Sequence, residues 1–164
     1  MPKIDVNEQL FFSLLGREYS YSPEFEHLLS SAKAELDEAP SDDTPKSERT
    51  IKIELNDTNR PDLWSTAGLA RLLRMHLGGA SNKERYRAFL STQSAAKASE
   101  NRRVIVDPEL EHIRPFMTAF VISGKPIDEP MLKDIIQTQE KLCWNFGRKR
   151  RSVSMGVYRS ALIS

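Results

Sequence analysis

Four consecutive cationic side chains could neutralise the phosphates of a nucleic acid. They are Arg148, Lys149, Arg150 and Arg151. Lys and Arg bind phosphates whatever the base sequence. Cations at this position could instead complement a helix C-terminus and keep the following turn in water, and the sequence leaves both interpretations open. The whole chain of 164 residues has a formal net charge of +1, so a nucleic-acid contact would depend on this local patch.

The other residue types that often do chemistry form no recognisable site. His27, His76 and His112 lie far apart, without Cys or acidic neighbours at metal-ligand spacing. Cys143 falls on the apolar stripe of an expected helix, where a thiol is more often a small buried hydrophobe than a nucleophile. The glycine pair at 78–79 lacks the Gly-Lys-Ser/Thr order of a phosphate-binding loop. We therefore expect no catalytic residue and no metal site.

The N-terminal third of the chain predicts a strand and two helices. Residues 3–6 alternate like a short strand, and Asn7 can cap a helix that ends at Gly16. Ser22 and Pro23 have the types expected at the start of a second helix.

Two segments follow whose structure is less well defined. Residues 34–38 could continue the second helix or form an edge strand, and the sequence leaves both alternatives open. Residues 40–49 contain no large apolar side chain, so we expect a solvated loop.

The best-defined local structure is a strand, a turn and a helix. Ile51, Ile53 and Leu55 alternate with polar residues, which predicts a half-buried strand. A helix with Ser65 as its N-cap then follows, and the glycines at 78–79 are expected to end it. Its apolar stripe consists of Leu69, Leu72, Leu73 and Leu77.

A change in composition separates the two halves of the chain. Residues 91–102 are small and polar, and we place a domain boundary there. Strands are expected at 104–106, 116–122 and 152–157, and a long helix is expected to begin at Asp128. The inward face of that helix should consist of Leu132, Ile135, Ile136, Leu142, Cys143 and Phe146.

Membrane and secretory classes are disfavoured. No apolar run approaches the ~20 residues that a membrane-spanning helix needs, and the first residues lack a signal-peptide pattern. The single cysteine excludes an intramolecular disulfide. We therefore expect a soluble, cytoplasmic protein with no membrane partner.

Several blocks of sequence, in the same order, resemble the β subunit of phenylalanyl-tRNA synthetase in its archaeal and eukaryotic form. The most specific block contains Asn59, Arg60, Pro61 and Asp62, followed by Gly-Leu-Ala-Arg at 68–71. Further blocks lie at residues 1–6, 14–16, 53–55, 106–108, 113–116, 139–142 and 148–150. The resemblance covers most of residues 1–79 and 103–158.

The resemblance implies an α+β fold in two parts. Residues 1–79 would form a small N-terminal unit with helices packed on a short β-hairpin or sheet, and residues 80–102 a linker with a short helix. Residues 103–164 would be the truncated opening of a second, editing-like α+β domain. We therefore expect the chain to be the N-terminal part of a longer subunit.

The family implies an α₂β₂ enzyme that joins phenylalanine to its tRNA with ATP and Mg²⁺. This chain would contribute to assembly with the α subunit, to tRNA(Phe) binding and to the start of the domain that hydrolyses mischarged tyrosyl-tRNA. It lacks the class II synthetase signature, so we expect it to bind neither ATP nor Mg²⁺ and not to aminoacylate alone. Tyr158 and Arg159 stand where many relatives have His-Asp, so no editing residue is carried over.

The 59–62 motif is best interpreted as architecture. Asn59 and Asp62 can bind free backbone amides, Pro61 fixes φ, and Arg60 can bridge a carboxylate or carbonyl. The functional alternative is that Arg60 contacts RNA or a partner subunit.

Two other functions are carried as alternatives. One is a freestanding nucleic-acid-binding module of winged-helix type, and the other is an independent hydrolase of mischarged tRNA. Duplex DNA binding would favour the first, and hydrolysis of tyrosyl-tRNA by the isolated chain would favour the second.

Overall fold

The structure, a computed structural model, describes residues 2–57, 59–93, 103–124 and 126–163. The chain forms two compact units, one made of Met1–Lys83 with Ile127–Val157, the other of Glu84–Pro126 with Tyr158–Ser164. The domain boundaries expected after residues 79 and 102 stay a prediction. Part of the expected linker, residues 94–102, lies outside the described residues.

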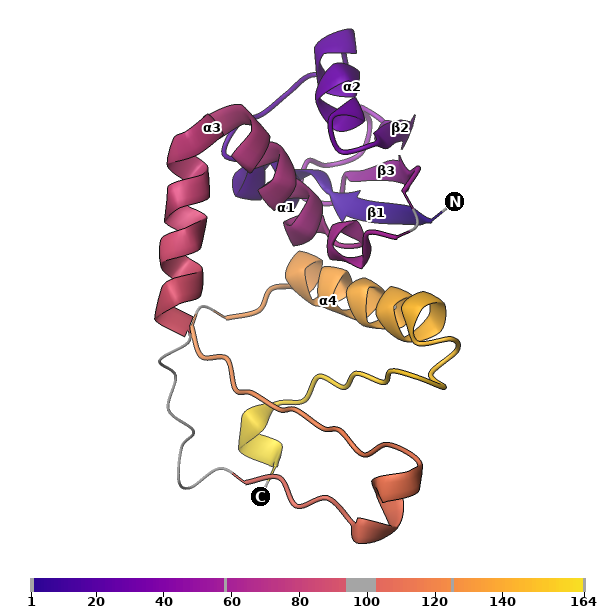
Figure 1. Cartoon of the computed structure of the whole chain (residues 1–164). Helices are drawn as coiled ribbons and strands as arrows, with labels where there is room; N and C mark the ends of the chain where they lie inside the picture. The colour runs from indigo at the N-terminus through magenta and orange to yellow at the C-terminus, as the bar shows by residue number, and fades with distance from the viewer. Residues whose placement is uncertain (1, 58, 94–102, 125, 164) are drawn as a thin grey trace. The chain divides into compact units, whose positions relative to one another are not determined.

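A three-stranded antiparallel sheet lies at the centre of the first unit (Figure 1). Its strands are β1 (Lys3–Asn7), β2 (Ala34–Glu38) and β3 (Thr50–Leu55), in the order β1-β3-β2. The alternatives for residues 34–38 are thereby decided in favour of an edge strand. The structure confirms an α+β fold for this part of the chain.

One face of the sheet is apolar and is covered by helices α1 (Glu8–Leu15), α2 (Pro23–Ser30) and α3 (Thr66–Gln93). The other face is charged, and Lys3 there lies 2.6 Å from Asp37 on an edge strand of the same sheet. This division confirms the alternation expected for the strands. The fully buried members of the core include Ile4, Val6, Phe11, Phe25, Leu29, Ile51, Ile53, Leu69 and Leu73.

Local capping signals position the helices. The Asn7 side chain accepts a hydrogen bond from the Leu10 amide at 2.9 Å, and Gly16 ends α1 with φ at 83°. Ser65 Oγ accepts one from the Gly68 amide at 3.0 Å. These three caps are as predicted.

Helix α3 continues through the glycine pair at 78–79, so the predicted end of this helix is wrong. Glycine within a helix costs about 1 kcal/mol relative to alanine, but it keeps its backbone hydrogen bonds. Leu69 and Leu73 of the expected stripe are buried, whereas Leu77 is exposed. The apolar stripe therefore covers the core only along the first turns of α3.

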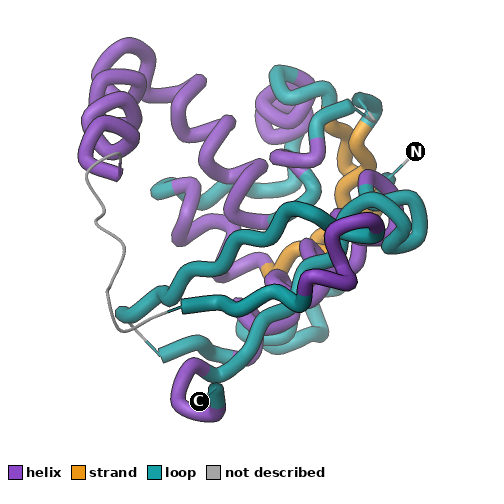
Figure 2. Tube along the Cα trace, turned by 60° about the horizontal axis from the view of Figure 1, so that its bottom comes forward, coloured by secondary structure: helices purple, strands orange, loops and turns teal. Residues whose placement is uncertain are grey.

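The strands predicted at 104–106, 116–122 and 152–157 are not formed, and the described part of 103–164 contains no sheet (Figure 2). Outside the C-terminal helix, the described part of this segment contains the short 3₁₀ turns η2 (Pro108–His112) and η4 (Ser160–Leu162). An apolar run becomes a strand only when a neighbouring strand pairs with its backbone groups. The predicted editing-like second sheet is therefore not shown.

Helix α4 (Glu129–Lys141) begins as predicted, because Asp128 Oδ1 accepts a hydrogen bond from the Met131 amide at 2.9 Å. Its expected apolar face is largely not buried. Among the six residues predicted to point inward, Cys143 is buried, while Leu132, Ile136 and Phe146 are exposed.

Polar side chains dock α4 on the N-terminal elements instead. The Gln137 amide accepts a hydrogen bond from the Asp5 N–H at 2.8 Å and donates one to the Asp5 carbonyl at 2.9 Å. Asp134 Oδ1 accepts a hydrogen bond from the Thr66 amide at 2.8 Å, at the first residue of α3. In this way α4, which lies beside β1 in Figure 1, closes part of the β1 edge, and its Asp134 caps the N-terminus of α3.

Replacing Gly68 should destabilise the first unit, because an added Cβ would overlap the Asp62 carbonyl oxygen. For Gly68→Ala we expect the free energy of unfolding to fall by about 2 kcal/mol or more, the range typical of overpacking. Urea denaturation followed by circular dichroism measures it. Gly124→Ala is the matched control, since nothing lies within 4 Å of a Cβ there; equal stability of the two variants would contradict the prediction.

Removing the Gln137 amide should open the β1 edge. Gln137→Ala leaves the Asp5 N–H and carbonyl without these partners, so we expect faster hydrogen exchange at the Asp5 amide and a decrease of about 1 kcal/mol in stability. Lys133→Ala is the control on the same helix, because it removes only an exposed ion pair with Glu129. Unchanged exchange at Asp5 in Gln137→Ala would contradict the docking role.

Candidate functional site

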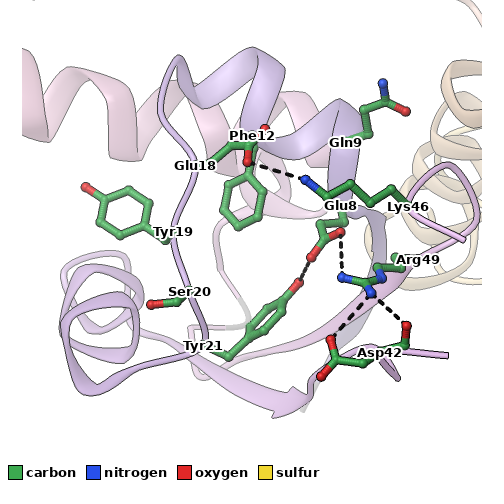
Figure 3. Close-up of a pocket in the computed structure, with 10 residues that line it drawn as sticks. All are labelled: Glu8, Gln9, Phe12, Glu18, Tyr19, Ser20, Tyr21, Asp42, Lys46 and Arg49. Atoms are coloured by element: carbon green, nitrogen blue, oxygen red, sulfur yellow. Dashed lines mark hydrogen bonds and ion pairs between the residues drawn. The ribbon is translucent and has the colours of Figure 1, made fainter. Parts of the chain in front are cut away.

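A polar pocket of about 460 Å³ lies beside the N-terminal end of α1 (Figure 3). Its wall is formed by the start of α1, the segment before α2 and the loop before β3. The lining residues are Glu8, Gln9, Phe12, Glu18, Tyr19, Ser20, Tyr21, Asp42, Lys46 and Arg49. Acidic, basic and aromatic groups therefore face one space.

Glu8 is the buried charge of this pocket. Tyr21 donates a hydrogen bond to Glu8 Oε1 at 2.5 Å, and Arg49 Nη1 lies 3.9 Å from Oε2 (Figure 3). Glu8 is also the first residue of α1, where the helix dipole favours a negative charge. A carboxylate can be buried here because a phenol, a guanidinium and the helix end all stabilise its charge.

Arg49 organises the loop that was expected to be simply solvated. Its Nε donates to the Thr44 carbonyl at 2.9 Å, and Nη2 donates to the Asp42 carbonyl at 2.9 Å. Only 17% of the Arg49 side chain is exposed. The loop is thus tied to α1 through Glu8.

Sequence reasoning missed this arrangement, although one signal was available. Glu8 precedes Phe11 and Phe12 by three and four residues, so it lies on the apolar face of its own helix. A carboxylate on an apolar face needs a partner from elsewhere in the fold. Nothing local identifies that partner as Arg49.

Burial raises the pKa of the Tyr21 phenol, and its hydrogen bond to Glu8 and the Glu8 charge raise it further. Tyr21 therefore remains a neutral donor well above neutral pH. Its ring also packs edge-on to Phe25, with centroids 5.9 Å apart. The strongest polar groups of the pocket bind one another, which is the arrangement of a structural tie rather than of an acid and base poised for substrate.

The 59–62 turn places its four motif residues together where α3 begins. Arg60 Nε and Nη2 lie 2.9 and 2.8 Å from the two Asp62 carboxylate oxygens. Hydrogen bonding from Arg60 lowers the pKa of the Asp62 carboxyl. Pro61 starts the short 3₁₀ turn η1 (Pro61–Leu63), and the Asn59 amide donates to Asp57 Oδ1 at 3.2 Å. This geometry supports the architectural interpretation, and the functional roles of the four residues stay a prediction.

The four predicted nucleic-acid-binding residues form one exposed turn, hereafter the basic turn (residues 148–151). It follows the π-helical turn η3 (Leu142–Phe146) at the end of α4. Arg148, Lys149 and Arg150 all have left-handed backbone, with φ of 50°, 58° and 65°. The structure thus gathers the cations in one turn, on a different element from the 59–62 turn.

The cysteine predicted to be structural is buried at the base of the basic turn. Cys143 Sγ accepts a hydrogen bond from the Met155 amide at 3.1 Å. Within the described ranges, no three His, Cys, Asp or Glu side chains come together as a metal site would require. None of the helices seen in those ranges is both long and apolar enough to cross a membrane.

The first unit is an α+β domain that carries an exposed cationic turn, and its described residues form no metal-binding cluster. The family model described as the Phe-tRNA synthetase beta subunit B1 domain matches residues 1–79. The chain is homologous to the N-terminal region of the phenylalanyl-tRNA synthetase β subunit.

Individual relatives agree with this assignment. The chain is 47% identical over 191 residues to the phenylalanine–tRNA ligase β subunit of Treponema pallidum, covering 98% of this chain and 32% of that protein. The chain is also 40% identical over 163 residues to the β subunit of Borreliella burgdorferi, covering 99% of this chain and 27% of that protein. The chain therefore spans about a third or less of the length of these curated relatives.

A solved structure is also similar. It is the crystal structure of an N-terminal fragment of the phenylalanyl-tRNA synthetase β subunit from Pyrococcus horikoshii. The TM-score is 0.71 at 32% sequence identity, with 98% of this chain and 42% of that chain covered.

The Tyr21 phenol should make stability depend on alkaline pH. Because its pKa in the folded protein is raised above the ordinary 10.0, the native state holds this proton more tightly than the unfolded chain. The stabilisation is complete below pH 10.0 and is lost as pH rises beyond it. Tyr21→Phe should flatten this decline in the free energy of unfolding, measured by urea denaturation across that range. Tyr158→Phe, which removes an exposed tyrosine, should leave the decline unchanged. If the free energy of unfolding falls with pH equally in the wild type, Tyr21→Phe and Tyr158→Phe, the decline does not come from Tyr21.

Proposed function

We propose that the chain acts as the N-terminal part of the β subunit of a phenylalanine–tRNA ligase. Its role is to support subunit assembly, to bind tRNA(Phe) and to begin the editing domain. The observation that carries this proposal is the 47% identity to a β subunit along 98% of the chain. The whole enzyme, an α₂β₂ assembly in the cytoplasm, joins phenylalanine to its tRNA with ATP and Mg²⁺.

The residues of this chain contribute binding and positioning. ATP and Mg²⁺ are assigned to the whole enzyme, and no step of the ATP chemistry is assigned to this chain. The pocket at Glu8 supports the same division, since its carboxylate is already bound by Tyr21 and lies near Arg49.

Assembly depends on the shape of the first unit, which the 59–62 turn helps to set. The side chains of Arg60 and Asp62 are each 42% exposed, so their ion pair contributes less than about 1 kcal/mol to the stability of the fold. Gly68 packs directly against the carbonyl of Asp62, which fixes how α3 leaves the turn. These contacts favour a scaffold role for the motif over direct contact with RNA.

tRNA binding is assigned to the basic turn. All four of its side chains are exposed, and among the described residues no carboxylate forms an ion pair with Lys149 or Arg151. Exposed, closely spaced cations are the groups that replace counterions along a nucleic-acid backbone.

The editing role is assigned to residues 103–164 by family resemblance. Tyr158 and Arg159 stand where the family resemblance leads us to expect His-Asp, so no editing residue of this chain is assigned. Hydrolysis of tyrosyl-tRNA by the isolated chain would instead support an independent hydrolase.

The assembly role predicts co-purification with a synthetase α subunit when the two chains are co-expressed. The Arg60→Ala variant should have an unchanged circular dichroism spectrum and should still co-purify with the α subunit. This is expected because Arg60 is proposed to hold the 59–62 turn and not to contact the partner. Loss of the α subunit from a folded Arg60→Ala protein would reassign Arg60 to the interface. A folded wild-type chain that never retains the α subunit would refute the assembly role.

The basic turn predicts salt-dependent tRNA binding. Replacing Arg148, Lys149, Arg150 and Arg151 by Ser should weaken tRNA affinity and reduce the slope of log K against log salt by about one for each phosphate that is no longer neutralised. Filter binding at several salt concentrations measures both quantities. Lys133→Ser is the control, since it removes an exposed cation of α4 outside the turn. Unchanged affinity and slope in the fourfold variant would remove the nucleic-acid assignment.

A further inference from the structure

We propose that the exposed indole of Trp144 is a stacking site for an unpaired RNA base, next to the phosphate-binding basic turn. This inference rests on the proposed tRNA-binding function and specifies which part of the RNA the surface contacts. The cations would bind phosphates, and the indole would bind the face of a base.

The first observation is the exposure of a large aromatic ring beside a cation. Trp144 is 58% exposed, whereas Trp64, the other tryptophan of the chain, is 4% exposed within the core. Lys149 Nζ lies 5.7 Å from the centroid of the Trp144 ring, within the range of a cation–π contact. Sites for single-stranded nucleic acids combine these two elements, an aromatic platform and cations that follow the backbone.

The second observation is the backbone that holds the ring and the cations together. The Gly147 amide donates to the Leu142 carbonyl at 2.8 Å, which closes a π-helical turn around Trp144. The Lys149 amide then donates to the Trp144 carbonyl at 2.8 Å. Trp144 and Lys149 are therefore linked by the main chain as well as through their side chains.

Left-handed backbone is unfavourable for residues that carry a Cβ, and three such residues in succession persist only when surrounding contacts impose them. Here the Arg150 amide donates to the carbonyl of the buried Cys143 at 2.8 Å. The Cys143 thiol in turn binds the Met155 amide, and Gln139 Nε2 donates to the Met155 carbonyl at 2.8 Å. The turn is thus anchored from both sides, which preorganises the cations relative to the indole.

The chemistry favours an unpaired base over an acidic peptide or a duplex. A carboxylate-rich peptide would be attracted by the cations, but it has no planar group that matches the indole. Every nucleobase has a π-face, and that face is accessible in loops, bulges and single-stranded ends of RNA. In a duplex the neighbouring base pairs cover it.

Fluorescence of the full chain tests this inference. Titration with a single-stranded RNA oligonucleotide of mixed sequence should quench the emission of Trp144, and Trp64 provides a buried internal reference. Trp144→Ala should weaken binding of this oligonucleotide by about fivefold or more, the lower end of base–aromatic stacking. Trp144→Phe should restore most of the affinity. Binding of the same sequence as a duplex should be unaffected by Trp144→Ala.

Other outcomes separate this inference from the proposed function. If replacing residues 148–151 by Ser weakens RNA binding while Trp144→Ala does not, RNA binding stands and the stacking site is refuted. If neither change weakens binding, both proposals fail. If Trp144→Ala weakens the binding of single-stranded and duplex RNA equally, the proposed base contact is overturned. Displacement of the oligonucleotide by a glutamate-rich peptide at equal concentration would also overturn it. Tyr158→Ala is the control for removal of an exposed aromatic ring elsewhere.

Discussion

The pairing of β3 with a strand on each side holds together segments that are up to about fifty residues apart, and the helices and pocket of the first unit depend on it. Ile51, Ile53 and Leu55 are buried on one face of this central strand. A shift of one residue in the register would turn all three to solvent and expose the charged face to the core. The apolar face selects the register, and the register in turn determines which helices can cover the sheet.

The C-terminal helix α4 joins this core by a different kind of contact. Gln137 binds the backbone of β1, and Asp134 binds the first amide of α3. These contacts satisfy backbone groups that strand edges and helix starts leave open, and they require a particular position along the helix rather than a large apolar area. The apolar residues Leu132 and Ile136 of α4 are correspondingly exposed.

Charged groups have two distinct roles in this chain. Glu8 and Arg49 are largely buried and tie α1 to the loop before β3, so their charges are used within the fold. The basic turn is exposed and is held in a left-handed conformation beside the Trp144 ring. This contrast explains why the proposed RNA contact lies on the basic turn, although the pocket is the more enclosed space. It also fits the proposed tRNA-binding function.

The sequence by itself determined the features that depend on neighbouring residues, and only the tertiary structure decided those that depend on partners far along the chain. The caps at Asn7, Ser65 and Asp128 could be predicted, because each acts on an amide three residues away. The four cations at 148–151 were equally visible, but their left-handed backbone and their position beside Trp144 were not. The strand at 116–122 was predicted wrongly, since an apolar run indicates that a strand is possible and only a paired neighbour makes one. The partners of Glu8 and of the β1 edge were undetectable for the same reason, because sequence spacing carries no record of which distant side chain folding brings within hydrogen-bonding distance.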